Sequence, residues 1–380
     1  MKVAYFNANL EVGQDGVTRC VYKMIDGAIE RGHNAIAITS TLPTGTASVP
    51  IYGVPSVALP LQKNYRIALP GYQAFAKHIQ EFQPDILHIN SPCTLGYSAM
   101  KYAKNFGLPV VATYHTHFPT YPRYYNLNGL EELIWRLSRR LYNKVDRTFV
   151  PALPILRELD QHGIQRLEYL PNGVDTGAFS PLYRSEEWRR RFGNGEKPVI
   201  LFVSRLVWEK DLRVLAQTFT ELRSHRDDFE MVIVGDGHAR QELQEMMPGA
   251  HFLGYQSGRT LAESFASADI FVFPSTTETF GLVTLEAMSS GLAPVAAKVG
   301  GAVGIIQEGS SGLFAEPLNG TDLAKKVEWL LDHPNHRKVF AEHALARAQE
   351  FRWDRILDRL FESYKEVIES FRRRRFPRAA

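Results

Sequence analysis

The chain has 380 residues, a length that favours two domains over one. Its composition, 44% hydrophobic and 22% charged, is typical of a globular protein, and a formal net charge of +3 is too small to indicate nucleic acid as a partner. Two cysteines do not make a disulfide framework, and no apolar run has the length of a membrane span or of a signal segment. We therefore expect a cytoplasmic protein.

Short apolar runs alternate with amphipathic helical stretches in the first half of the chain. Strands are predicted at residues 2–6, 35–39, 85–89, 109–113, 147–151 and 166–170, and helices near 17–31, 71–82, 94–106 and 130–145. This alternation is typical of a doubly wound α/β sheet. A polar loop with Gly13 and Gly16 joins the first strand to the first helix. It has no G-x-G-x-x-G motif, so it is equally consistent with a plain connection and with a ligand loop.

Two histidines, His115 and His117, follow the predicted strand at 109–113. Open α/β sheets bind their ligands at the carboxyl ends of the strands, which is where these side chains fall. A neutral imidazole can exchange hydrogen bonds with a sugar hydroxyl or orient a reacting group. The alternative is an ordinary loop histidine whose hydrogen bonds are made to the backbone.

The alternation restarts after an irregular segment that begins with PNGVD at residues 171–175. Strands are predicted at 199–203, 230–234, near 251 and at 270–273. The segments AAKVGGAVGII and GSSGLFAEP are predicted as small loops, and two helices are expected within residues 321–350. A last helix begins at Trp353 and ends in four arginines, Arg372 to Arg375.

Charged and glycine residues follow two of these later strands. Arg205 and Lys210 lie five residues apart at the mouth of the helix after 199–203, where two cations could neutralise a diphosphate leaving group. Solvated surface charge is the alternative. After the strand at 230–234, the turn with Gly235 and Gly237 would let the backbone approach a nucleotide, although glycine is common in such loops.

The segment from Phe271 to Gly291 combines a buried strand, a loop of hydroxyl residues and an apolar helix that begins near Phe280. A helix N-terminus at this edge of a sheet has unpaired N–H groups that favour an anion. Glu278 lies just before this helix and Glu286 lies within it. A carboxylate can accept two hydrogen bonds from a sugar diol. The alternative is a dipole-capping Glu278 and a solvated Glu286. The apolar neighbours of Glu286 argue against the latter.

The run ETFGLVTLE resembles the Glu-x7-Glu signature of the retaining nucleotide-sugar glycosyltransferases of family four, and the resemblance spans nearly the whole chain. It implies the GT-B fold, an α/β architecture of two Rossmann-like doubly wound domains with a cleft between them. Residues 1–171 would form the acceptor-side domain and 172–352 the nucleotide-sugar domain. A C-terminal helix at 353–371 would cross back to the first domain.

The same resemblance assigns roles to residues of this chain. Glu286 would bind the ribose diol, and Arg205 and Lys210 would stabilise charge on the diphosphate. Glu278 would hold the hexose, His115 would lie near its reacting face, and the role of His117 stays open. The sugar-nucleotide donor would also be contacted by the glycine loop with Gly13 and Gly16 and by the later turn with Gly235 and Gly237. The backbone N–H groups of Phe280, Gly281 and Leu282 would contact it as well.

The resemblance predicts a hexosyltransferase whose donor is GDP-mannose or a UDP-hexose and whose acceptor is a hydroxyl group, with no further cofactor. The run HTHFPTYPRYY followed by a basic helix is most similar to members that glycosylate membrane lipids. No D-x-D motif occurs, so we expect a metal-independent reaction. A nucleotide-sugar 2-epimerase of the same architecture, or transfer to a polysaccharide or small molecule, stays open.

Basic residues gather in the segment 130–147 and at the chain's end, where Phe376 and Arg378 follow the four arginines. Basic segments of this kind can bind an anionic membrane surface reversibly, so we expect peripheral contact at the inner face of the cytoplasmic membrane. The alternative for the end of the chain is a disordered, solvated tail.

Overall fold

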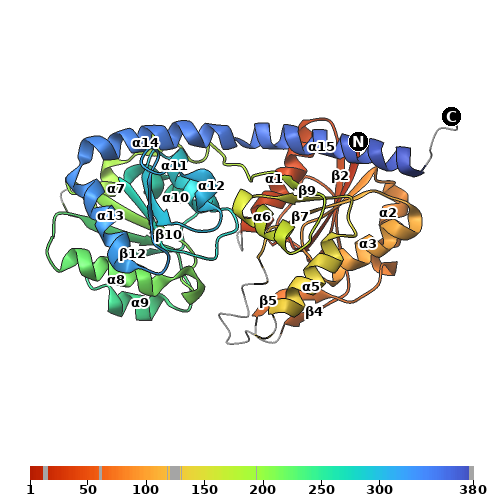
Figure 1. Ribbon diagram of the computed structural model, residues 1–380, viewed down its shortest axis with the longest axis horizontal. Coiled ribbons are helices and arrows are strands. Elements are labelled where there is room, and N and C mark those ends of the chain that lie inside the picture. The colour runs from red at the N-terminus through yellow and green to blue at the C-terminus, as the bar shows by residue number, and fades with distance from the viewer. Residues whose placement is uncertain are drawn as a thin grey trace. The chain divides into compact units, whose positions relative to one another are not determined.

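The computed structural model describes residues 1–11, 16–59, 62–117, 119, 129, 131–193 and 195–375, and of residues 59 and 62–65 the backbone only. The chain divides into two compact units (Figure 1). One unit comprises Met1–Asn172 together with Trp353–Ala380, and the other comprises Gly173–Arg352. We call them the N-terminal unit and the C-terminal unit.

The N-terminal unit is built on a parallel sheet in the order β3-β2-β1-β6-β7-β8-β9. The central strands are apolar and buried, as expected for a parallel sheet with both faces covered by helices. A separate antiparallel hairpin, β4–β5, lies in a segment for which the sequence predicts no strand. The strands are β1 (Lys2–Asn9), β2 (Asn34–Thr41), β3 (Ile51–Gly53), β4 (Ser56–Leu59), β5 (Gln62–Ala68), β6 (Ile86–Ile89), β7 (Val110–Thr113), β8 (Arg147–Val150) and β9 (Leu167–Tyr169).

Helices cover this sheet, and the last helix of the chain is one of them. They are α1 (Gly16–Glu30), α2 (Gln73–Phe82), α3 (Thr94–Phe106), α5 (Glu131–Tyr142), α6 (Leu153–Gln161) and α15 (Trp353–Arg375). The apolar side of α15 lies in the same core cluster as α1 and β1. At Gly27 of α1 a Cβ atom would lie 2.4 Å from Leu357 Cδ1, so the absent side chain lets the two helices approach closely.

A buried polar contact also holds α15 on the sheet. His88 of β6 is fully buried and hydrogen-bonds Tyr364 of α15 through Nδ1. Its Nε2 atom lies 2.7 Å from Thr113 Oγ1. Burial lowers the pKa of His88 to about 3, so its imidazole is neutral. Both ring nitrogens therefore have partners within the core.

The C-terminal unit contains a second parallel sheet, in the order β12-β11-β10-β13-β14-β15. The chain runs outward from β10 to β12 and then returns to place β13 on the other side of β10, which makes the β10/β13 boundary a topological switch point. The strands are β10 (Val199–Val203), β11 (Glu230–Val234), β12 (His251–Gly254), β13 (Ile270–Phe273), β14 (Ala293–Ala297) and β15 (Leu313–Ala315). Strand β15 lies in a segment predicted as a loop, and no strand was predicted at β14.

The helices of this unit enclose one large apolar core. They are α7 (Glu186–Arg190), α8 (Leu212–Arg223), α9 (Arg240–Met246), α10 (Gly258–Ser267), α11 (Leu282–Ser289), α12 (Ala302–Ile305), α13 (Gly320–Asp332) and α14 (Pro334–Ala348), with 3₁₀ turns η3 (Pro181–Tyr183), η4 (Trp208–Lys210) and η5 (Gln349–Phe351). Helix α11 is buried from Thr284 to Ser289. Among the described residues of the two units, no helix is both long and apolar enough to span a membrane.

Candidate active site

The loops that follow β10, β11 and β13 meet at the carboxyl edge of the C-terminal sheet, beside the switch point. Hydrogen bonds tie the loop after β10 to the loop after β13. The Asp211 carboxylate accepts from Thr276 N at 2.7 Å and from Thr276 Oγ1 at 2.8 Å. Thr277 Oγ1 donates to Glu209 O at 3.0 Å. The sheet topology therefore brings together residues that are far apart in the sequence.

Asp211 is the residue that fixes this junction. It adopts a left-handed conformation with φ 53°, a region that aspartate tolerates better than most residues. Burial raises the pKa of its carboxyl group, against the opposing effect of the hydrogen bonds from Thr276. Asp211 directly follows Lys210 and is the N-cap residue of α8, and it was not among the predicted site residues.

Lys210 and Glu278 form an ion pair between these two loops, through Lys210 Nζ and Glu278 Oε1. Their side chains are only 15% and 23% exposed, so water screens the pair less than it would screen a surface pair. The structure thus brings together a cation predicted for the diphosphate and a carboxylate predicted for the hexose. A direct contact between them was not predicted.

Arg205 lies on the same loop as Lys210 but has a different environment. Its side chain is exposed, and among the described residues it has no ion pair or side-chain hydrogen bond. The guanidinium carries five N–H donors that can bind phosphate oxygens. Its diphosphate role stays a prediction.

Gly235 and Gly237, after β11, pack against the backbone of the loop that carries Arg205. A Cβ atom would lie 1.8 Å from Ser204 O at Gly235 and 2.3 Å from Leu206 O at Gly237. Their φ values of 136° and 158° also disfavour other residues. Close packing of two protein loops therefore accounts for both glycines, and their contact with a nucleotide stays a prediction.

The N-terminus of α11 has the form expected for an anion site. Gly281 is its N-cap with φ 92°, and the helix begins at Leu282, two residues later than predicted. Phe280 is buried. Two further glycines brace this turn: Gly301 N donates to Glu278 O at 3.1 Å, and a Cβ atom at Gly300 would lie 2.4 Å from the same oxygen. The paired glycines of the segment AAKVGGAVGII were the sequence signal for this contact.

Glu286 lies in the second turn of α11 and is only 6% exposed. The adjacent Leu285, Ala287 and Met288 are fully buried. The alternative of a solvated helix residue is therefore wrong. A carboxylate is retained in such a position when it is hydrogen-bonded, which agrees with a binding role. The ribose diol as its partner stays a prediction.

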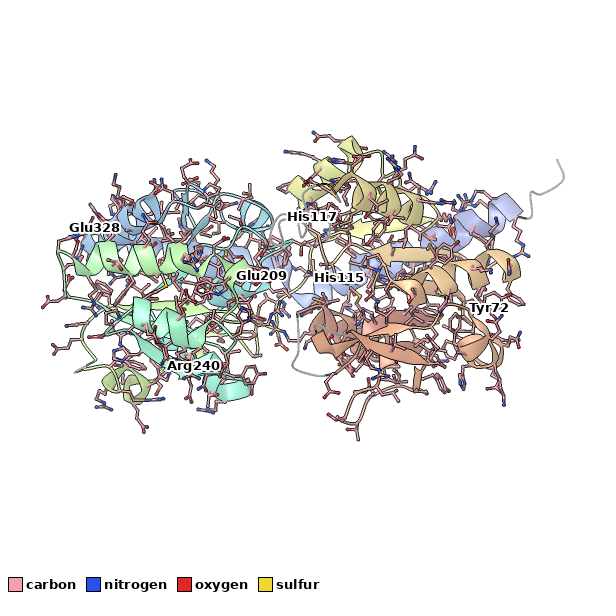
Figure 2. The ribbon with its side chains drawn as sticks, turned by 90° about the horizontal axis from the view of Figure 1, so that it is seen from below. Tyr72, His115, His117, Glu209, Arg240 and Glu328 are labelled. Carbon is pink, nitrogen blue, oxygen red and sulfur yellow. The ribbon has the colours of Figure 1, made fainter. Side chains whose placement is uncertain are left out.

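The two histidines predicted near the hexose, His115 and His117, are labelled in Figure 2. Both are buried, but they have different partners. His115 Nε2 lies 3.1 Å from Asn90 Oδ1, and burial lowers the pKa of His115 to about 4. His117 contacts Tyr114 Oη at 3.0 Å and Glu158 Oε1 at 3.3 Å, and its ring packs edge-on against Trp135. These contacts tie the segment after β7 to α5 and α6, and the part that His117 has in the reaction stays open.

Two predicted features remain to be placed. Gly13 lies outside the described residues, and Gly16 is the first residue of α1. No cluster of three or more His, Cys, Asp or Glu side chains suited to a metal ion occurs among the residues that the structure describes.

Comparisons with known proteins identify the family. Glycosyltransferase Family 4 matches residues 14–178, and Glycosyl transferases group 1 matches residues 184–347. The chain is 32% identical over 376 residues to a GDP-mannose-dependent alpha-mannosyltransferase of Corynebacterium glutamicum, which covers 97% of this chain and 89% of that protein. It is 28% identical over 262 residues to the alpha-monoglucosyldiacylglycerol synthase of Streptococcus pneumoniae, with coverage of 65% and 59%.

The fold agrees with this assignment. Sucrose-phosphate synthase from Thermosynechococcus elongatus superimposes with a TM-score of 0.80 at 17% identity, covering 97% of this chain and 100% of that one. The predicted GT-B fold of two parallel-sheet α/β domains is confirmed. The chain belongs to family four of the glycosyltransferases and transfers a hexose from a nucleotide sugar.

Proposed function

We propose that this hexosyltransferase uses GDP-mannose as its donor and the hydroxyl group of a membrane glycolipid as its acceptor, with retention at the anomeric carbon. GDP-mannose is proposed as the donor because the chain is similar, over 97% of its length, to a GDP-mannose-dependent alpha-mannosyltransferase. The likeness to a diacylglycerol glucosyltransferase supports a lipid acceptor.

In this proposal the carboxyl edge of the C-terminal sheet holds the donor. Glu286 accepts hydrogen bonds from the ribose hydroxyls, and the N-terminus of α11 faces the phosphate next to the hexose. Arg205 and Lys210 bind the diphosphate. Because Lys210 is paired with Glu278 in the structure, the arriving diphosphate gives Lys210 a new anionic partner. The Glu278 carboxylate is then available to the hexose hydroxyls.

The reaction exchanges one bond at the anomeric carbon for another. The bond between this carbon and the diphosphate oxygen breaks, and the acceptor oxygen bonds to the same face of the sugar. The acceptor proton passes to an oxygen of the departing diphosphate, so GDP is released. Arg205 and Lys210 stabilise the negative charge that develops on this leaving group. His115 accepts a hydrogen bond from a hydroxyl group of the hexose while the sugar ring changes shape.

The donor is tested with a panel of UDP-, GDP- and ADP-linked hexoses. The full chain is incubated with each donor and a lipid extract, and mass spectrometry follows both the released nucleotide and the glycosylated lipid. GDP-mannose should be consumed faster than every other donor. Faster consumption of a UDP- or ADP-linked sugar would reject GDP-mannose while leaving the transferase class intact.

Metal independence is a separate prediction, because cations of the chain take the place of a metal at the diphosphate. We expect transfer to continue at an undiminished rate in EDTA. The control is the same assay with added Mn²⁺, which should not raise the rate. Loss of turnover in EDTA and its return with Mn²⁺ would mean that the diphosphate is held differently.

The contact with a membrane is proposed for the outer face of α5. Leu133 and Leu137 are 46% and 57% exposed, and Arg136 and Arg140 are exposed on the same side of the helix. Neither arginine has an ion-pair partner among the described residues. Just beyond the helix, Lys144 lies over the ring of Tyr97, with Nζ 5.0 Å from the ring centroid. Exposed leucines flanked by cations are typical of helices that lie in a membrane interface.

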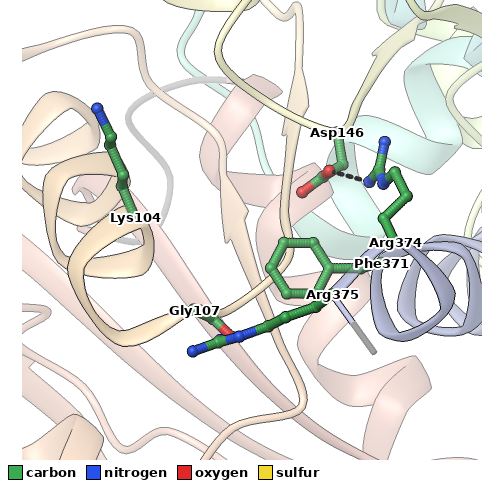
Figure 3. Close-up of a pocket in the computed structure, with 6 residues that line it drawn as sticks. All are labelled: Lys104, Gly107, Asp146, Phe371, Arg374 and Arg375. Atoms are coloured by element: carbon green, nitrogen blue, oxygen red, sulfur yellow. Dashed lines mark hydrogen bonds and ion pairs between the residues drawn. The ribbon is translucent and has the colours of Figure 1, made fainter. Parts of the chain in front are cut away.

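The arginines at the end of α15 contribute less to the proposed membrane contact than the sequence suggests. Arg374 pairs with Asp146, and Arg375 hydrogen-bonds Gly107 O, both at a pocket that Lys104 and Phe371 also line (Figure 3). Arg372 Nη2 lies 3.5 Å from Asp85 Oδ1. The disordered-tail alternative is therefore wrong for residues 372–375, which are helical and partly neutralised. Phe376 and Arg378 lie outside the described residues.

Sedimentation with vesicles tests this contact. Binding should rise with the fraction of anionic lipid and fall with salt, because each basic residue near the surface contributes about 1 kcal/mol. The double variant Leu133→Glu, Leu137→Glu should lose most of the binding, and deletion of 372–380 should lose less. The control carries Leu182→Glu and Leu318→Glu, at leucines of the C-terminal unit that are 92% and 63% exposed. Equal losses in both double variants would reject α5 as the contact.

A further inference from the structure

We propose that Asn90 is a positioning residue for hexose transfer: it fixes the tautomer of His115 and offers its own amide N–H group to a sugar hydroxyl. The inference rests on the proposed role of His115 at the hexose. It concerns a residue that the Glu-x7-Glu signature and its companions do not include, and it assigns a hydroxyl-bearing ligand to the carboxyl edge of the N-terminal sheet.

The topology of the N-terminal sheet brings Asn90 to His115. Strands β6 and β7 are neighbours, with Ile89 paired to Ala112, so the residues that follow them leave the sheet side by side. Asn90 directly follows β6, and its backbone N–H donates to Phe6 O of β1 at 2.8 Å. Asn90 is 1% exposed, and its position is fixed by the sheet on which it ends. The switch point of this sheet lies at the same edge, between β1 and β6.

The contact between the two side chains determines which ring nitrogen of His115 carries the hydrogen. Asn90 Oδ1 lies 3.1 Å from His115 Nε2. An amide oxygen can only accept, so Nε2 is the N–H donor, and Nδ1 of the neutral ring is the acceptor nitrogen. The nearby His88 is also buried and neutral, so the imidazole of His115 has no cationic histidine beside it. Nδ1 is therefore suited to accept a hydrogen bond from a hydroxyl group.

The ring of His115 lies against an amide, whereas the ring of His117 lies against a carboxylate. His117 Nε2 lies 3.3 Å from Glu158 Oε1. A carboxylate in place of the Asn90 amide would favour a protonated imidazole at His115. His115 lies against a neutral amide, which fixes the ring orientation without favouring a cation. A protonated imidazole has no acceptor nitrogen and could not accept from a sugar hydroxyl.

The second observation is a hydrogen-bond donor of Asn90 that has no acceptor. The amide nitrogen of Asn90, Nδ2, is buried and has no hydrogen-bond partner in the part of the chain that the structure describes. Buried amide groups without a partner are uncommon and lower stability. The next residue, Ser91, does have a partner, because its Oγ donates to Asn7 Oδ1 at 2.7 Å. A hydroxyl oxygen of a bound sugar would supply the partner that Nδ2 lacks.

Asn90→Asp is the variant that separates this role from a structural one. It retains the shape and the acceptor oxygen but places a carboxylate beside Nε2, which raises the pKa of His115 from about 4. Wild-type kcat should be independent of pH between about 5.5 and 8, since the ring is neutral throughout this range. In the variant, kcat should fall as the pH decreases through the raised pKa. Asn90→Ala should lose about tenfold in kcat at every pH, without a new pH dependence.

The matched control is Asn105→Asp, at an exposed asparagine of α3 that hydrogen-bonds Tyr72. It should retain the wild-type rate and pH profile, and all three variants should bind GDP as the wild type does. Wild-type kcat and pH profile in both Asn90 variants would overturn the inference. So would ¹⁵N NMR of the wild type if it placed the hydrogen of His115 on Nδ1, a result that does not depend on turnover. Absence of transfer by the wild type from every nucleotide sugar would instead reject the proposed function.

Discussion

Replacing Arg205 with alanine should lower kcat by about 10²–10³-fold, because the loss of one donor to developing charge typically has this effect. The midpoint of thermal unfolding should stay close to that of the wild type. The side chain is exposed and has no ion pair or side-chain hydrogen bond among the described residues, so its removal breaks no interaction within the C-terminal unit. Steady-state kinetics and calorimetry of the same preparation measure both quantities.

The control for this substitution is Arg259→Ala. The side chain of Arg259, on α10, is 77% exposed; it pairs with Glu263 of the same helix, and its Cζ lies 5.8 Å from the centroid of the Tyr183 ring. It should retain wild-type turnover, because it lies outside the loops that meet at the switch point. Lys210→Ala should also lower kcat, with an added loss of stability since Glu278 would lose its partner. A similar fall in kcat for Arg205→Ala and Arg259→Ala would remove Arg205 from the diphosphate site.

Truncating Glu286 to alanine should weaken nucleotide binding by about 1.5–3 kcal/mol, which is about 10–150-fold in Kd. The reason is that a buried carboxylate among Leu285, Ala287 and Met288 makes charge-assisted hydrogen bonds that water cannot replace. Glu286→Gln should show a smaller loss, because the amide retains one acceptor oxygen. Titration calorimetry with GDP measures the affinities.

Glu342→Gln serves as the control, at an exposed position on α14. Its GDP affinity should equal that of the wild type. Circular dichroism should show that the Glu286 variants retain their secondary structure, so that a weaker affinity reports on the site. A folded Glu286→Ala variant with unchanged affinity for GDP would exclude the diol role.

Much of the C-terminal sheet could be predicted because its strands are apolar runs that end in loops. Strands β10, β11 and β13 have the bounds expected for them. Strand β14 was missed, because its sequence APVAA consists mainly of alanine, which has little preference for strands. Its position between β13 and β15 determines its conformation. The β4–β5 hairpin was missed as well, since it lies outside the α/β alternation on which the prediction depended.

The candidate site could be predicted by residue but not by contact. The spacing of Glu278 and Glu286 is visible in the sequence, whereas the pairing of Lys210 with Glu278 depends on the return of β13 to the side of β10. The bracing of Glu278 by Gly300 and Gly301 depends on β14 lying beside β13. Asn90 was not singled out, because a lone asparagine after a strand has no distinctive pattern until its side chain meets His115.

Incubation of GDP-mannose with and without acceptor tests the central claim, which is that the protein moves a hexose from a nucleotide sugar to an acceptor hydroxyl. Mass spectrometry and chromatography follow the sugar nucleotide and the lipid together. With acceptor, each GDP released should be matched by one hexose on the lipid. Without acceptor, the donor should stay unchanged apart from slow hydrolysis. Appearance of an isomeric sugar nucleotide in the absence of acceptor would contradict this claim and indicate an epimerase.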